Sequence, residues 1–124
     1  MRALVRTAFV ILCLAAAPVW AAGFVEGVED LPLMDGLEGE AGTAVVFDKP
    51  GGRIVEAFAT GHVGRAEALA FYGATLPQLG WTPEKTGTSA RDGRLAFGRE
   101  GERLNLEFRE AKGALRVRFA IAPD

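Results

Sequence analysis

The chain has few of the residues on which many enzyme mechanisms depend: its 124 residues include one cysteine, one histidine and one serine. The cysteine, Cys13, lies in the apolar N-terminal segment, so the rest of the chain offers no disulfide, thiol nucleophile or thiolate metal ligand. A nucleophile and base pair would have to join Ser89, in a polar loop, to His62. A single histidine without cysteine also excludes the usual zinc sites.

Long apolar runs are scarce as well, and the main one lies near the N-terminus. Two arginines precede an apolar run over residues 8–17, and small residues follow at Val19 and Ala21. This pattern predicts a secretory signal peptide over residues 1–21, cleaved after Ala21. The run is shorter than the roughly 20 residues of a membrane-spanning helix. We therefore expect a periplasmic or secreted protein without a stable membrane span after cleavage.

Neither sign of charge dominates, since 14 Lys and Arg residues stand against 16 Asp and Glu residues, and 49% of the chain is hydrophobic. These values are typical of one globular domain and exclude a collagen, a coiled coil and a wholly disordered chain. The acids are concentrated in residues 23–42, which contain five glycines and no base. We predict an acidic extended arm over residues 22–42, here called the leader. It either lays its apolar side chains on the body or serves as a docking segment for another protein.

The body of the chain, residues 43–124, shows the period-two pattern of strands in several places. Residues 43–48 and 53–60 are rich in β-branched and aromatic side chains and flank a proline and glycine turn, which predicts a hairpin. Nearer the C-terminus, three segments alternate apolar with polar residues. The pairs Glu100-Gly101 and Lys112-Gly113 connect them as tight turns. Each segment should therefore bury one face and expose the other.

One helix is predicted, over residues 65–79. It begins after Gly64 as the N-cap, and Pro77 is expected to loosen it near Thr75. Gly80 offers a left-handed exit that returns Trp81 to the last turn. The apolar stripe of the helix has spacings of three and four, and it comprises Leu69, Tyr72, Leu76 and Leu79.

These elements predict an α+β fold. The expected architecture is a two-layer sandwich in which the helix packs on an antiparallel sheet of about five strands, in the order ββαβββ. The acidic arm precedes this domain, which spans residues 43–124.

The segment FYGATLPQLGW, residues 71–81, resembles the Phe-Tyr, Leu, Gly-Trp segment at the helix end of small exported bacterial proteins of uncharacterised families. The segments PLMDGL and FDKPGGRIVEA are similar to segments of such proteins. The resemblance covers about half of the chain after the signal, and it implies the fold and an envelope location. Its motifs are architectural, so it implies no active-site residue.

Few side chains are candidates for a catalytic or metal-binding role. His62 lies just before the predicted helix, and with a nearby carboxylate it is the candidate base of a small envelope hydrolase. Asp48 and Glu56, on adjacent strands of the first hairpin, are a candidate carboxylate pair. Three acids of the leader lack the ligand spacing of a calcium-binding loop, namely Asp35, Glu38 and Glu40. The sequence predicts no metal and no cofactor.

The most regular surface feature in the sequence is the spacing of the arginines. If the alternating apolar residues of the last two strands point inward, four arginines must share the opposite face, with Arg94 beside them: Arg103, Arg109, Arg116 and Arg118. Three interpretations are open, namely a solvated face with cross-strand ion pairs, a dock for the acidic leader or another protein, and a site for an anionic ligand. Nucleic acid is not expected, because export removes the protein from it and the face lacks exposed aromatics for stacking.

The sequence therefore favours a non-catalytic exported binding or accessory module. Its predicted partner-binding residues are the four arginines, and its predicted partner is an envelope protein or an anionic envelope component. The hydrolase that uses His62 is the alternative.

Overall fold

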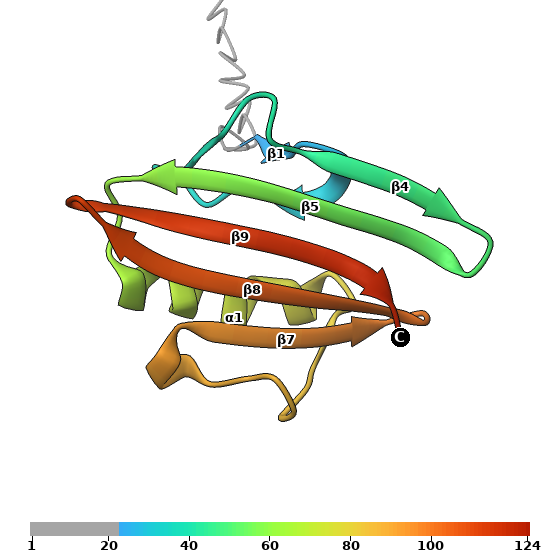
Figure 1. Ribbon diagram of the computed structural model, residues 1–124. Helices are drawn as coiled ribbons and strands as arrows, with labels where there is room; N and C mark the ends of the chain where they lie inside the picture. Colours follow the sequence, from blue (N-terminus) through green and yellow to red (C-terminus); the bar gives the residue numbers. More distant parts are fainter. Residues whose placement is uncertain (1–22) are drawn as a thin grey trace, which may run out of the picture.

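The computed structural model describes residues 23–124 as an α+β fold with one α-helix and a mostly antiparallel sheet (Figure 1). The predicted signal peptide, residues 1–21, lies outside the described residues. The elements, in chain order, are β1 (Phe24–Val25), β2 (Val28–Pro32), β3 (Glu38–Gly39), β4 (Val45–Lys49), β5 (Gly52–Gly61), α1 (Arg65–Gln78), β6 (Thr82–Pro83), a 3₁₀ turn (Ala90–Asp92), β7 (Arg94–Arg99), β8 (Glu102–Ala111) and β9 (Ala114–Pro123).

The described strands form two sheets. The main sheet has the order β3-β5-β9-β8-β7-β6, and β4 pairs with β5 beside β3; β1 and β2 form a separate two-stranded sheet. The predicted order ββαβββ with about five strands is therefore wrong in its count, because residues 23–124 form nine strands. The additional strands, β1, β2, β3 and β6, have two to five residues each. Segments of this length carry too little alternation to be distinguished from loops.

The predicted hairpins are confirmed. β4 and β5 pair antiparallel around the turn at Pro50 and Gly51, and β8 pairs with both β7 and β9 over most of its length. In the β7–β8 turn, Glu100 and Gly101 have φ of 48° and 79°, and Lys112 and Gly113 have φ of 52° and 77° in the β8–β9 turn. Positive φ at both central residues is what a two-residue turn needs to match the strand twist.

Helix α1 begins after Gly64, as predicted, and continues through Pro77 to Gln78. The expected loosening near Thr75 is wrong. Pro77 lies one residue from the helix end, so its missing N–H removes only one hydrogen bond. The end is closed as predicted, because Gly80 has φ of 91° and the Trp81 N–H donates to the Leu76 carbonyl at 3.1 Å.

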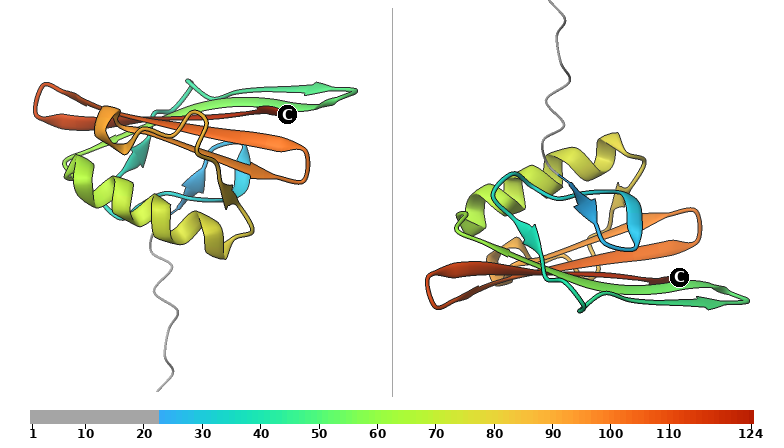
Figure 2. Two further views of the ribbon diagram at one scale, coloured as in Figure 1. Left: turned by 90° about the horizontal axis from the view of Figure 1, so that it is seen from below. Right: turned by 90° about the horizontal axis from the view of Figure 1, so that it is seen from above.

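The core lies between α1 and one face of the sheet. Figure 2 shows α1 and the β1–β2 hairpin on the same side of the main sheet. The buried residues of α1 are Ala68, Tyr72 and Leu76, whereas Leu79 is 39% exposed and Leu69 is half-buried. The predicted stripe is thus correct in its centre and wrong at its end. The buried side chains of β8 and β9 alternate as predicted, namely Leu104, Leu106, Phe108, Leu115, Val117, Phe119 and Ile121. In β5, Val55, Ala57 and Ala59 are buried in the same alternating way. In β7 the predicted alternation is wrong, because the adjacent residues Ala96 and Phe97 are both buried and Leu95 is half-buried.

The acidic leader is part of this core. Five of its apolar side chains are buried: Val25, Val28, Leu31, Leu33 and Leu37. The Tyr72 hydroxyl of α1 accepts a hydrogen bond from the Met34 N–H at 3.1 Å and donates one to the Pro32 carbonyl at 2.9 Å. The leader and the end of β5 also approach each other closely, because a Cβ atom at Gly61 would lie 1.9 Å from the Gly36 carbonyl oxygen. The expectation that the leader lays its apolar side chains on the body is confirmed.

Candidate functional site

The sheet face opposite α1, here called the outer face, carries the four predicted arginines. Arg103 and Arg109 alternate with buried residues of β8, and Arg116 and Arg118 alternate with buried residues of β9. Since α1 and the β1–β2 hairpin both lie on the other side, residues 23–124 leave most of the outer face without a covering layer (Figure 2). The exception is the segment after β6, whose Gly87 lies against Ala96 and Asn105.

Three of the four arginines surround one shallow depression, here called the arginine groove. It has a volume of about 200 Å³ and is lined by Phe58, Glu107, Arg109, Arg116 and Arg118. The strand register explains this grouping. Arg109 lies directly opposite Arg116 on the neighbouring strand, and Arg118 lies between Phe58 on one side and Glu107 on the other.

The three groove arginines differ in how closely they are paired with a carboxylate. Arg116 donates through Nε and Nη2 to the two carboxylate oxygens of Glu40, both at 2.9 Å, and its guanidinium stacks 3.9 Å from the centre of the Phe58 ring. Arg118 donates to Glu56 at 3.0 and 2.6 Å. Within residues 23–124, the ion pair of Arg109 is a 3.6 Å contact with Glu107, and the Arg109 side chain is 80% exposed. Its guanidinium is the one most available to an external anion in the groove.

Arg103 does not belong to this group. It donates to the Thr86 carbonyl and lies 3.5 Å from Glu84, so it holds the segment after β6 against the sheet. Arg109 lies six positions further along β8, which is roughly 20 Å along a strand. Arg94, on β7, lies opposite Glu107 of β8 and contacts Asp92 at 3.6 Å.

The bidentate pair between Glu40 and Arg116 joins the leader to the groove. Hydrogen bonds from the guanidinium lower the pKa of Glu40 from its ordinary value of 4.5, and the same contact raises the pKa of Arg116. A carboxyl whose pKa is lowered by folding stabilises the fold above its unfolded pKa, and this contribution is lost as the pH falls through the folded value.

We therefore expect Glu40→Gln to unfold more easily than the unsubstituted chain at neutral pH, with a difference that closes below the ordinary carboxyl pKa. Urea unfolding at neutral pH and at about pH 3 measures it. Glu38→Gln, at an exposed leader position, is the control and should show no such gap. A Glu40→Gln deficit that persists undiminished at about pH 3 would contradict this account.

The alternative catalytic candidates are not assembled into a site. His62 is exposed, and within residues 23–124 its polar contact is Nδ1 to the Gly113 carbonyl at 3.2 Å rather than a carboxylate. Asp48 lies opposite Arg53, whereas Glu56 lies opposite Val45. Because the two acids occupy positions of opposite parity in the hairpin, they point to opposite faces of the sheet. They do not form the paired carboxylates of a hydrolase.

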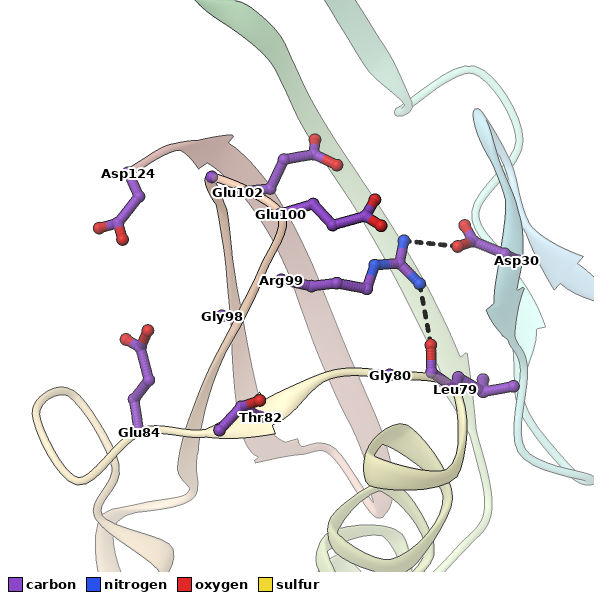
Figure 3. Close-up of a pocket in the computed structure, with 11 residues that line it drawn as sticks. Asp30, Leu79, Gly80, Thr82, Glu84, Gly98, Arg99, Glu100, Glu102 and Asp124 are labelled. Atoms are coloured by element: carbon purple, nitrogen blue, oxygen red, sulfur yellow. Dashed lines mark hydrogen bonds and ion pairs between the residues drawn. The ribbon is translucent and has the colours of Figure 1, made fainter.

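Sequence reasoning missed a larger cavity at the other end of the molecule. It has a volume of about 680 Å³ and surrounds Arg99, which donates to Asp30 at 2.5 Å and to the Leu79 carbonyl at 3.1 Å (Figure 3). The Arg99 guanidinium also stacks 4.1 Å from the centre of the Trp81 ring. Its carboxylates come from several elements that no local motif connects: Asp30, Glu84, Glu100, Glu102 and Asp124.

Most of this acidic charge is already neutralised. Asp30 pairs with Arg99, Glu102 with Arg53 at 2.7 Å, and Glu84 with Arg103. The hydrogen bonds that Arg53 donates to the Glu102 carboxylate raise the pKa of Arg53, as expected for a close ion pair. We interpret the residues around the cavity as structural, because Arg99 of β7 hydrogen-bonds both to the end of α1 and to β2.

Within residues 23–124, no three histidine, cysteine or carboxylate side chains are grouped so as to hold a metal ion. Of the leader acids considered for calcium, Glu40 is paired with Arg116. In the same part of the chain, no helix has the length and apolar character needed to cross a membrane.

Neither a family model, nor a curated protein, nor a solved structure matches this chain. The resemblance of residues 71–81 to small exported proteins therefore stays a prediction.

Proposed function

We propose that the chain is a non-catalytic exported binding or accessory module whose outer face contacts a protein partner in the bacterial envelope. The observation that carries the proposal is the arginine groove. It places the 80% exposed Arg109 beside Phe58 on a sheet face that α1 and the leader leave uncovered. Arginine and aromatic side chains are the residue types most enriched at protein interfaces.

The groove favours a partner that presents a carboxylate. Arg109 and Arg116 lie directly opposite each other, and like charges in such positions repel unless an anion lies between or beside them. Arg116 already holds a carboxylate in bidentate geometry, that of Glu40. Arg109 has no equivalent partner in residues 23–124, so an aspartate, glutamate or C-terminal carboxylate of another protein would complete the pairing.

Apolar side chains on the same face support a protein rather than a small anion as the partner. Val45 and Phe47 lie opposite Glu56 and Ile54 in the β4–β5 register, so they share the outer face, and they are 43% and 59% exposed. A small anion would gain nothing from these side chains, whereas a protein surface would bury them. The envelope location is supported by the signal-like pattern of residues 1–21.

We expect Arg109→Glu to lower the capture of the envelope partner about tenfold in a pull-down from an envelope extract. The immobilised chain and the matched variant Lys85→Glu, which reverses an exposed charge outside the groove, should capture the same protein equally well. Capture should also weaken as salt is raised, because the pairing is exposed to solvent. Equal capture by all three chains at low salt would overturn the proposal.

A further inference from the structure

On one side the main sheet ends at β3 and β4, and within residues 23–124 no further strand pairs with the edge of β4. β4 pairs with β5 only, and within residues 23–124 no backbone hydrogen bond connects its other edge to another segment. Figure 1 shows the β4–β5 hairpin extending along the margin of the sheet. An edge of this kind presents unpaired N–H and C=O groups to any strand that approaches.

The centre of this edge is apolar on both faces. Val45 and Phe47 point to the outer face, and Val46, opposite Val55, points to the inner one. They are 43%, 59% and 47% exposed, respectively, and they are three of the five large hydrophobic side chains that the described residues expose. Proteins usually protect an exposed edge with a central charge, a proline or a bulge. β4 has charges only at its end, at Asp48 and Lys49.

The order of these side chains is self-complementary. In an antiparallel pair of identical strands with Val46 opposite Val46 of the second copy, Val45 faces Phe47 of the other copy twice. Aromatic and β-branched residues in directly opposite positions stabilise a sheet. A shift by two residues in one direction places Asp48 opposite Val46, and a further such shift places Asp48 opposite Asp48. Those registers bury or oppose charge, so the Val46 register is favoured over both.

We propose that β4 pairs antiparallel with β4 of a second copy of this chain, with Val46 on the twofold axis. The axis is perpendicular to the sheet, because opposed residues must point to the same face. The two main sheets then form one continuous sheet, and both arginine grooves lie on one side of the dimer. A five-residue edge is smaller than the interfaces of stable dimers, which bury about 1,200–2,000 Å². The association is therefore reversible and depends on concentration.

The register can be tested by cross-linking in a chain whose Cys13 is replaced by alanine. We expect Val46→Cys to give a disulfide-linked dimer under mild oxidation, because directly opposite residues bring their Cβ atoms close enough to bridge. Phe47→Cys is the matched control. In the Val46 register its copies lie on a diagonal of about 7–8 Å, so it should cross-link far less.

Sedimentation of the chain without any cysteine should show a monomer and dimer in equilibrium, and Val46→Lys should shift it to monomer. Circular dichroism and thermal unfolding of Val46→Lys verify that the variant still folds. A chain that stays monomeric at the highest soluble concentration overturns the proposal. So does preferential cross-linking of Phe47→Cys, since it indicates another register. Neither result bears on the arginine groove, which is tested by capture of the envelope partner.

Discussion

Replacing Leu31 by alanine is expected to lower the free energy of unfolding by about 2–5 kcal/mol, the usual cost of removing a large buried aliphatic side chain. Leu31 lies in β2, within the acidic leader, and is 0% exposed. A globular domain of this size is stabilised by about 5–15 kcal/mol in total. The leader substitution should therefore have an effect as large as a substitution in the body of the core.

Denaturant unfolding of three variants tests this expectation. Leu106→Ala removes an equally buried leucine of β8 and should cost a similar amount, whereas Leu79→Ala, at a 39% exposed position, should cost far less. If Leu31→Ala unfolds within about 0.5 kcal/mol of the unsubstituted chain, the leader is a loosely attached arm and its place in the core is wrong.

Replacing Tyr72 by alanine should cost about 3–5 kcal/mol, because Tyr72 is the residue of α1 that contacts both the main sheet and the leader. Its ring is 0% exposed and packs edge-on against Phe119, with the two centroids 5.5 Å apart. Its hydroxyl bonds to the backbone of Pro32 and Met34 in the leader. Loss of the side chain therefore leaves a cavity and also releases the leader from α1.

Tyr72→Phe separates these two contributions. It keeps the ring and leaves the Pro32 carbonyl and the Met34 N–H without their partner, so it should cost about 1–3 kcal/mol. Burial raises the pKa of Tyr72 above its ordinary value of 10.0. The stability contributed by the protonated hydroxyl is present below the unfolded pKa and is lost as the pH rises above it. Tyr72→Phe should lack this alkaline loss, and an unchanged alkaline profile would contradict the assignment.

The parts of the fold that the sequence predicts well are those with a local cause. Alternation in β8 and β9 correctly indicates which side chains are buried, because a half-buried strand has a period of two. Turns such as Lys112-Gly113 are identified by residue types that accept positive φ. The Gly80 exit of α1 follows from the same property.

The parts that sequence reasoning missed depend on contacts between distant residues. Leader strands β1 to β3 are short and are separated by turns that contain Gly27 and Gly36, and they exist because β5 and α1 provide partners for them. Leu79 has the right spacing for the helix stripe, but it is the C-cap of α1, after the last helical residue, Gln78. Helical periodicity alone does not show at which residue a helix ends, so it does not predict that the Leu79 side chain is exposed.

The candidate site also has features that follow from local sequence and features that depend on contacts between distant residues. Alternation places Arg103 and Arg109 on one face, yet it does not show that Arg103 is held by Glu84 and the Thr86 carbonyl. Nor does it show that Glu40, 76 residues before Arg116, neutralises that arginine. Such pairings decide which arginine remains available to a partner, and they follow only from the tertiary structure.

We propose that this protein contacts its partner through the outer face of the sheet, at the arginine groove. Site-specific photo-cross-linking in cells tests it most directly, with the photoreactive residue at position 109 or at position 85. We predict a cross-linked adduct to one envelope protein from position 109 and none from position 85. Adducts from position 85 alone, or equal adducts from both positions, would contradict the claim.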